Sequence, residues 1–277
     1  MHLPREAIAQ AVAGRYVVER HLGRGGTSTV FLARVAGGHD RVAIKVLHPE
    51  LSATVIRQRF HREIVLLRKL AHPHILPVLE SEEAGPLLYY VTRYAPGGSL
   101  AGLLALRERI PLDQVLTVVR EVAEALDHAH AQNVLHRDIK PGNILFDVDR
   151  VLVCDFGIAG AIEKAAGDES SSGVVLGTPA YMSPEQAKGL RPLDRRSDIY
   201  ALGCVAYEML AGEAPFTGPT LQAVVARQAQ QPPPRIGIIR PDLPRHFETA
   251  LHAALAKDPA DRPPSGAAFA RRLAGGA

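Results

Sequence analysis

Two short segments near the middle of the chain constrain its fold and chemistry more than any other feature. The first is His136–Asn143 (HRDIKPGN), and the second is Asp155–Gly157 (DFG), which begins twelve residues (155 − 143) after the first one ends. An aspartate that faces an incoming hydroxyl, followed by an amide and a carboxylate that bind Mg²⁺, is typical of a phosphoryl-transfer centre. The spacing therefore predicts this role for Asp138 and a metal-binding role for Asn143 and Asp155.

The composition is that of a globular protein. The 277 residues are enough for one large domain or two lobes, and 47% of them are hydrophobic and 22% charged. The net charge of +3 is small, and no basic run with interleaved aromatic residues occurs. We therefore expect no nucleic-acid partner.

The cysteine content and the hydropathy pattern indicate a compartment. Cys154 and Cys204 are the only cysteines, which is too few for a disulfide framework and fits a reduced cytosolic setting. No run of 18 apolar residues occurs, so we expect no membrane-spanning segment and a cytoplasmic protein. Residues 1–14 are expected to form an N-terminal extension with a short helix, and residues 275–277 form a linker-like tail that a tether or sensor could follow.

The first third of the chain is predicted to be mainly β-structure. Short β-rich runs at 16–18, 30–33 and 42–46 are separated by glycine turns, and two more strands are expected between Ile75 and Thr92. The apolar period becomes helical over residues 53–70, with Ser52 as the N-cap.

The remainder is predicted to be mainly helical. One amphipathic helix is expected over 115–129, and a second over 198–210 is apolar nearly all round, hence buried, and ends at Gly212. The prediction is an α+β chain with two lobes. A small β-rich lobe would span 15–92, a hinge 93–97 and a larger helical lobe 98–274.

A glycine-rich turn lies between the first two predicted strands, and it includes Gly23, Gly25 and Gly26. Glycines let a backbone approach phosphates and offer N–H groups to them, but an ordinary hairpin turn is an equal alternative.

Lys45 lies in an apolar strand, where a lysine is costly unless it is paired. It could clamp α- and β-phosphates with Glu63 as its carboxylate partner, or extend from an edge strand to water.

Taken together, these motifs resemble the eukaryotic-type (Hanks-type) protein kinase family, and within it the bacterial serine/threonine protein kinases. The similarity covers residues 16–273. Besides the segments above, it rests on residues 177–185 (GTPAYMSPE), and on Asp198 and Arg262.

The resemblance implies roles for the catalytic residues. Asp138 would accept the substrate proton, and Lys140 would neutralise charge on the migrating γ-phosphoryl group of ATP. Asn143 and Asp155 would bind Mg²⁺, with Mn²⁺ as an alternative.

The resemblance also implies a nucleotide site, in which Lys45 and Glu63 form the phosphate clamp. The other nucleotide-binding residues would be Leu22, Gly23, Gly25, Gly26, Val30, Ala43, Thr92, Arg93, Tyr94, Ala95 and Leu145.

Lys140, two residues after the catalytic aspartate, together with Thr178, resembles serine/threonine rather than tyrosine kinases. The substrates implied are proteins. Glu185 and Arg262 would form a buried salt bridge that fixes the peptide-binding segment, and Asp198 would bond the backbone around His136 and Arg137.

Residues 165–178 are rich in glycine and serine and are expected to form an activation loop. By analogy with bacterial relatives, phosphate on Ser170 or Ser172 would pair with Arg137, and an unmodified serine linker is the alternative. A homodimer would allow autophosphorylation in trans.

Two other functions remain open. A pseudokinase that binds nucleotide without turnover is disfavoured because Lys45, Glu63, Asp138, Asn143 and Asp155 are all present. A small-molecule kinase of related fold is disfavoured by the segment 177–185.

Overall fold

The computed structural model describes residues 5–26, 28–48, 60–61, 64–106, 109–156 and 179–276. These residues divide into two compact units. Unit 1 contains the described residues up to 71 together with 76–95, and unit 2 contains 72–75 and the described residues from 96 onward. This α+β organisation, with a β-rich first unit and a mainly helical second one, confirms the predicted fold class.

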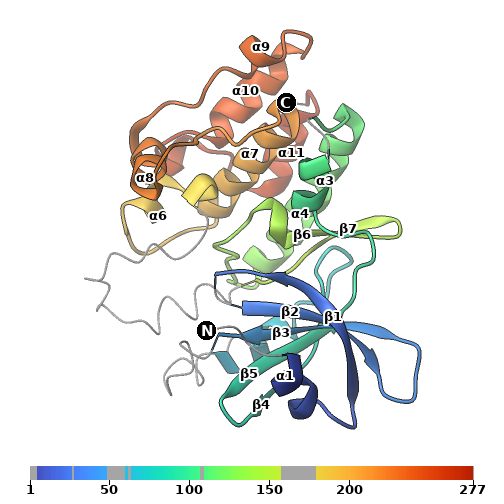
Figure 1. Ribbon diagram of the computed structural model, residues 1–277. Helices are drawn as coiled ribbons and strands as arrows, with labels where there is room; N and C mark the ends of the chain where they lie inside the picture. The colour runs from blue at the N-terminus through green and yellow to red at the C-terminus, as the bar shows by residue number, and fades with distance from the viewer. Residues whose placement is uncertain are drawn as a thin grey trace. The chain divides into compact units, whose positions relative to one another are not determined.

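Unit 1 is one antiparallel sheet with a helix on one face (Figure 1). The strand order is β1-β2-β3-β5-β4. The predicted β-rich runs are confirmed as strands, each longer than expected. The elements are α1 (Arg5–Ala11), β1 (Tyr16–Arg24), β2 (Ser28–Val35), β3 (Arg41–Leu47), β4 (Val78–Ala84) and β5 (Leu87–Arg93).

Helix α1 is the short helix expected in the N-terminal extension, and it belongs to the core of unit 1. Ile8 and Val12 are completely buried against alternate residues of the strands, among them Phe31, Ile44 and Val91. Arg5 Nη2 also donates to the Val18 carbonyl at 2.7 Å. The apolar face of α1 therefore covers one face of the sheet.

Of the helix predicted over 53–70, residues 60–61 and 64–70 are described. The chain is helical at 60–61 and 64–67, and it turns at 68–69, so the helix ends earlier than predicted. Phe60, Ile64 and Leu67 are buried, as the helical period predicts. The proposed N-cap Ser52 lies outside the described residues.

Unit 2 is built around two long helices. The elements are α3 (Leu100–Leu106), α4 (Leu112–Ala131), β6 (Ile144–Asp147), β7 (Arg150–Val153), α6 (Pro184–Ala187), α7 (Arg196–Ala211), α8 (Leu221–Gln230), α9 (Ile236–Ile239), α10 (Arg245–Ala254) and α11 (Gly266–Leu273), with 3-10 turns η2 (Pro141–Asn143), η4 (Pro179–Tyr181) and η5 (Pro259–Asp261). The helices predicted over 115–129 and 198–210 are confirmed as α4 and α7.

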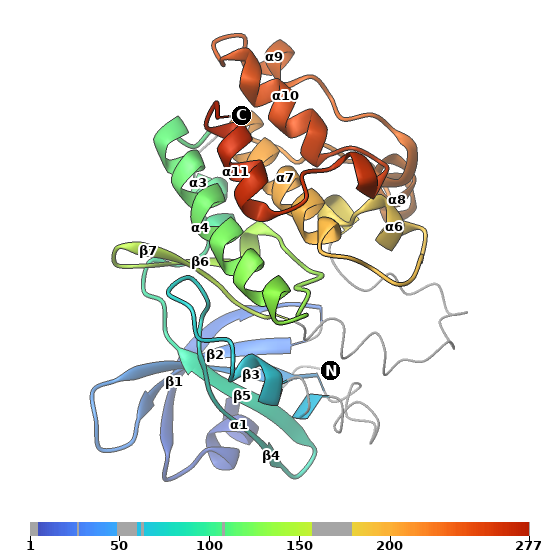
Figure 2. The same cartoon turned by 180° about the vertical axis from the view of Figure 1, so that it is seen from behind.

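Helix α7 is buried along almost its whole length, and it ends at Gly212, whose φ of +90° suits glycine. Figure 2 shows α4 and α11 lying side by side, and α4 also packs on α7. Gly266 allows the close approach of α11, because a Cβ atom there would lie 2.8 Å from the Ala123 carbonyl oxygen. None of the helices in the described ranges is both long and apolar enough to cross a bilayer.

Candidate active site

The segment 138–143 folds into a tight loop that gathers three of the predicted catalytic and metal-binding side chains. Lys140 Nζ lies 2.6 Å from Asp138 Oδ2, an ion pair with both side chains partly exposed. Asn143 Nδ2 donates to the Asp138 carbonyl oxygen at 2.8 Å and to its Oδ2 at 3.2 Å. Both bonds use the amide nitrogen, so Oδ1 is the acceptor end of the Asn143 side chain.

Asp155 is brought next to this loop by the β6–β7 hairpin. The hairpin pairs Ile144 with Val153, and the Cys154 N–H donates to the Asn143 carbonyl at 3.0 Å. Asp155 itself has a φ of +67°, in the left-handed region that few residues other than glycine adopt. Asn143 directly precedes β6 and Asp155 lies two residues after β7, so the two predicted metal ligands are at the same end of one hairpin.

His136 is bonded both to the loop 138–143 and to the residue before Asp155. It is completely buried, and its Nε2 lies 2.8 Å from the Cys154 carbonyl oxygen. Its Nδ1 accepts the Asp138 N–H at 3.2 Å, which assigns the ring proton to Nε2. Burial lowers the pKa of His136, in agreement with a neutral ring that donates on one side and accepts on the other.

Asp198, on α7, fixes the backbone directly before the loop 138–143. Its carboxylate accepts the N–H groups of His136 at 2.9 Å and Arg137 at 2.7 Å, and it lies 2.8 Å from His130 Nε2. Burial alone would raise its pKa, but these partners outweigh burial and lower the pKa. Asp198 is not the N-cap of α7, because the helix begins at Arg196 and its N-cap is Arg195.

Glu185 and Arg262 form a bidentate salt bridge, with both N–O distances at 2.7 Å. Ser197 Oγ donates to the same carboxylate at 2.7 Å, and the Arg262 side chain is fully buried. Burial would raise the pKa of Glu185, but the bonds and charge of Arg262 together with the Ser197 bond lower it below 4.5. The carboxylate is therefore held ionised and anchors α6 to the residues that follow η5.

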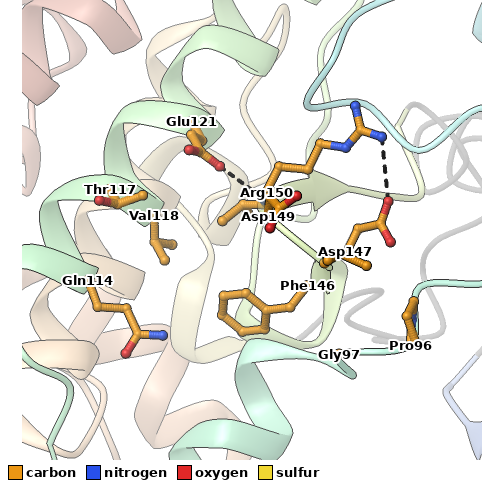
Figure 3. A pocket seen from close by; sticks show the side chains of 12 residues that line it. Pro96, Gly97, Gln114, Thr117, Val118, Glu121, Phe146, Asp147, Asp149 and Arg150 are labelled. Atoms are coloured by element: carbon orange, nitrogen blue, oxygen red, sulfur yellow. Dashed lines mark hydrogen bonds and ion pairs between the residues drawn. The ribbon is translucent and has the colours of Figure 1, made fainter.

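A cavity of about 450 Å³ opens beside the catalytic loop, and Lys140, Tyr181 and Glu208 are among the residues that line it. Tyr181 Oη donates to Glu208 Oε2 at 2.6 Å, and burial raises the pKa of Glu208. Figure 3 shows a second cavity, of about 600 Å³, between α4 and the β6–β7 hairpin, where Asp147 and Arg150 form an ion pair at 3.6 Å. None of the residues predicted from the sequence to be functional lines this second cavity.

In unit 1, the register of the sheet puts the predicted nucleotide side chains on one face. Val30 is opposite Lys45, and Ala43 is opposite Thr92. Directly opposed residues, and residues two apart on a strand, share a face, so these four lie on the face that α1 does not cover. The Lys45 ammonium lies 6.0 Å from the centre of the Tyr90 ring.

The remaining predicted nucleotide residues lie at strand ends and loops. Leu22 and Gly23 are on β1, and Gly25 closes the turn through a bond from its N–H to the Ser28 carbonyl at 2.8 Å. A Cβ atom on Gly23 or Gly26 would meet nothing within 4 Å. Arg93 ends β5, with Tyr94 and the buried Ala95 directly after it. Leu145, in unit 2, lies on β6 opposite Leu152.

Several predicted residues lie outside the described ranges. These are Glu63, the proposed partner of Lys45, together with Ser170, Ser172 and Thr178. Their roles stay predictions.

The structure also contains contacts that the sequence did not predict. His74 belongs to unit 2, where its Nδ1 lies 2.9 Å from the Val151 carbonyl oxygen, and Ile75 pairs with Val153. Gln228 is completely buried on α8 and donates to the backbone of η4. The available sequence signal was that Gln228 lies four residues after Val224, on the apolar face of the helix. Periodicity alone does not say what such a residue contacts.

Comparison with known proteins identifies the family. Residues 16–271 match the protein kinase domain model. The chain is 39% identical to the serine/threonine-protein kinase PknJ of Mycobacterium tuberculosis over 98% of its own length and 47% of the relative. It is 35% identical to the serine/threonine-protein kinase Pkn1 of Myxococcus xanthus, over 94% and 38% of the two chains. The chain thus spans less than half the length of these curated relatives.

A solved structure extends the similarity to the fold. The crystal structure of the Mycobacterium tuberculosis PknI kinase domain matches with a TM-score of 0.75 at 32% identity, covering 95% of this chain and 97% of the other. The catalytic-loop geometry, the family model and the shared fold agree with the resemblance read from the motifs. The chain therefore belongs to the protein kinase family.

Proposed function

We propose that this chain is a serine/threonine protein kinase that transfers the γ-phosphoryl group of ATP to protein hydroxyls. The observation that carries the proposal is the loop in which Lys140 and Asn143 each donate a hydrogen bond to Asp138. Asp198 holds the backbone directly before this loop. A phosphoryl-transfer enzyme works mainly by positioning and charge stabilisation, so a rigid loop of this composition is what the reaction requires.

In the proposed reaction, Asp138 orients the substrate hydroxyl and accepts its proton as the hydroxyl oxygen attacks the γ-phosphorus atom. The bond from the γ-phosphorus atom to the bridging oxygen breaks, and ADP leaves with that oxygen. Lys140, 2.6 Å from Asp138 in the resting loop, offers a cation for the charge on the transferred group. Its bond to Asp138 also restrains the carboxylate before substrate binds.

The donor set fits a divalent metal ion. Asn143 Oδ1 and the Asp155 carboxylate are hard oxygen ligands, and Mg²⁺ in such sites is held by one or two protein ligands with the remainder from phosphates and water. When bound, Mg²⁺ or Mn²⁺ would neutralise phosphate charge. The two bonds from Asn143 Nδ2 to Asp138 orient the amide so that its oxygen is the available ligand.

The proposed nucleotide residues of unit 1 are Val30, Ala43 and Thr92 for the adenine ring, and Lys45 with Glu63 for the phosphates. Leu22 and Leu145 would contact the adenine ring, and the backbone of residues 93–95 would bond its edge. The open space around Gly23 and Gly26 supports a ligand-related role, because no neighbouring atom of the described chain requires glycine there.

Protein is the proposed substrate class, because Glu185 and Arg262 anchor the segment 177–185 that the family uses to bind peptides. Thr178 would join this segment to Asp138 and Lys140. We further propose that Ser170 and Ser172 are autophosphorylation sites, modified in trans within a homodimer. Mass spectrometry after incubation with ATP tests this, and the absence of phosphate between Asp168 and Thr178 would contradict it.

The decisive experiment incubates the chain with labelled ATP, Mg²⁺ and a generic protein substrate. We expect transfer to serine or threonine in the wild type and a loss of about 10²–10⁴-fold in Asp138→Asn. The exposed Asp149→Asn is the matched control and should retain activity. Nucleotide binding without transfer would support a pseudokinase, and transfer only to a small molecule would support the second alternative.

We propose a cytoplasmic location and the lobe boundaries 15–92, 93–97 and 98–274. Cys154 and Cys204 do not form a disulfide with each other, which suits a reducing compartment. Cell fractionation tests the location, and limited proteolysis with cleavage concentrated outside the two lobes tests the boundaries.

A further inference from the structure

Gln228 is a completely buried amide on α8, and it is bonded to the backbone at the start of the described part of the peptide-binding segment. Its Nε2 donates to the Ala180 carbonyl oxygen at 2.6 Å and lies 3.3 Å from that of Pro179. These contacts are to main-chain oxygens, so they restrain the path of the backbone whatever the side chains of the segment are. They act immediately after Thr178, at the opposite end of the segment from Glu185.

The orientation of this amide is determined by a chain of donors that begins at Lys257. An ammonium group can only donate, and Lys257 Nζ donates to Tyr200 Oη at 2.9 Å. The Tyr200 oxygen accepts this bond, and its hydroxyl donates a hydrogen bond to Gln228 Oε1 at 2.5 Å. Because Oε1 is the acceptor of that bond, the nitrogen of the amide is turned toward Ala180.

The ammonium is itself held in one place. Lys257 Nζ also donates to the Gln228 carbonyl oxygen at 2.9 Å, and it lies 4.0 Å from the centre of the Phe216 ring. Within the described ranges no carboxylate pairs with Lys257. A half-buried lysine without a carboxylate is costly, so its presence here points to a role other than stability.

Lys257 and Tyr200 also contact Arg262, which forms the salt bridge with Glu185 at the other end of the segment. Arg262 Nη2 donates to the Lys257 carbonyl oxygen at 3.2 Å, and its guanidinium carbon lies 4.9 Å from the centre of the Tyr200 ring. Tyr200 thus lies between the two anchors of the segment, Gln228 for residues 179–180 and Arg262 for Glu185.

We propose that Lys257, Tyr200 and Gln228 form a hydrogen-bond relay that positions residues 179–180 for the protein substrate. Gln228 is then a positioning residue: it affects how the substrate binds and leaves ATP binding unchanged. This inference rests on the proposed kinase function, because substrate affinity is the property that the relay controls.

The first test is Gln228→Glu, which keeps the acceptor for Tyr200 but replaces the donor that faces Ala180 with an oxygen. We expect the KM for a protein substrate to rise by about tenfold or more, because a donor–acceptor pair becomes a repulsive pair of acceptors. The KM for ATP should not change. Gln222→Glu, an exposed position on the same helix, is the matched control and should leave both constants unchanged.

A second test removes the middle of the relay. Tyr200→Phe keeps the ring beside Arg262 and Lys257 but lets the Gln228 amide turn, so the substrate KM should rise less, by about two- to fivefold. Lys257→Met should raise the substrate KM in the wild-type background and add little in the Tyr200→Phe background. Additive effects of the two substitutions would overturn the relay.

Hydrogen exchange gives a readout that needs no activity. Amides of residues 180–183 should exchange faster in Gln228→Glu and remain as in the wild type in Gln222→Glu. The proposal is overturned if exchange and substrate KM are both unchanged, or if substrate KM, ATP KM and thermal stability all deteriorate together. If the wild type transfers no phosphate, the proposed function is refuted instead. In that case, faster exchange in Gln228→Glu would still show that the relay restrains the backbone of the segment.

Discussion

The carboxylate of Asp198 accepts the backbone N–H of Arg137 at 2.7 Å, although 61 positions separate the two residues. Arg137 has a φ of +69°, a conformation that costs a residue with a side chain about 1–2 kcal/mol. The bond therefore holds a strained backbone directly before Asp138, the proposed catalytic aspartate. It links the buried helix α7 to the loop 138–143.

Asp198→Asn should weaken both the fold and the activity. The amide can present only one oxygen, so one of the two backbone N–H groups would lose its acceptor, at a cost of about 1–3 kcal/mol. We expect a lower Tm and a lower kcat, measured by thermal unfolding and by phosphate transfer. Asp194→Asn, at an exposed position just before α7, is the control. A variant of Asp198 with wild-type kcat would contradict the positioning role.

The salt bridge of Glu185 should make stability depend on pH in the acid range. The pKa of Glu185 is lowered in the folded state, so its contribution is fully present above about pH 4.5, the value for an unperturbed glutamate, and is lost as the pH falls through the folded pKa. Denaturant unfolding from pH 7 to 3 should show a steeper loss in the wild type than in Glu185→Gln. The exposed Glu213→Gln should follow the wild type, and equal slopes for Glu185→Gln and the wild type would contradict the prediction.

Lys257 should make stability depend on pH in the alkaline range. Burial, opposed by Cys204 and supported by the charges of Arg262 and Lys188, lowers the pKa of Lys257 from 10.5 to about 8. The unfolded state therefore binds more protons above pH 8, and the free energy of unfolding should rise with pH from there. Burial raises the pKa of Cys204 to about 12, which acts in the opposite sense above pH 9.

The informative window is accordingly pH 8 to 9, where Cys204 contributes little. Denaturant unfolding should show a rise in stability across this window in the wild type and a smaller one in Lys257→Met. Lys69→Met, at an exposed position that does not affect Lys257, should behave as the wild type. If the two variants gave the same slope, the lowered pKa of Lys257 would be refuted.

Helix α1 should contribute to the stability of unit 1. Ile8 is fully buried on the sheet, so Ile8→Ala should cost about 2–5 kcal/mol of unfolding free energy. Denaturant unfolding measures this, and the exposed Glu6→Ala is the control. A loss below about 0.5 kcal/mol, the range of surface substitutions, would show that α1 is dispensable.

Local patterns accounted for much of the fold. The strands of unit 1 and the helices α4 and α7 were predictable because apolar periods of 2 and 3.6 are written in consecutive residues. The loop 138–143 was predictable for a related reason. Its members lie within six positions of one another, so the spacing alone limits their geometry.

Other features depend on contacts between distant elements. Ile8 and Val12 indicate an amphipathic helix, but not the sheet that it covers. Likewise, no local pattern near His74 shows that this residue belongs to unit 2.

By itself, the sequence determined which residue types could perform phosphoryl transfer and the strands and helices that carry them. Only the tertiary structure decided that Asp198 would hold the backbone of Arg137, and that Lys257, Tyr200 and Gln228 would orient one another toward residues 179–180. The physical reason is that a hydrogen bond depends on the direction of a donor and an acceptor in space. Residues from separate segments of the chain acquire that direction only when the chain packs.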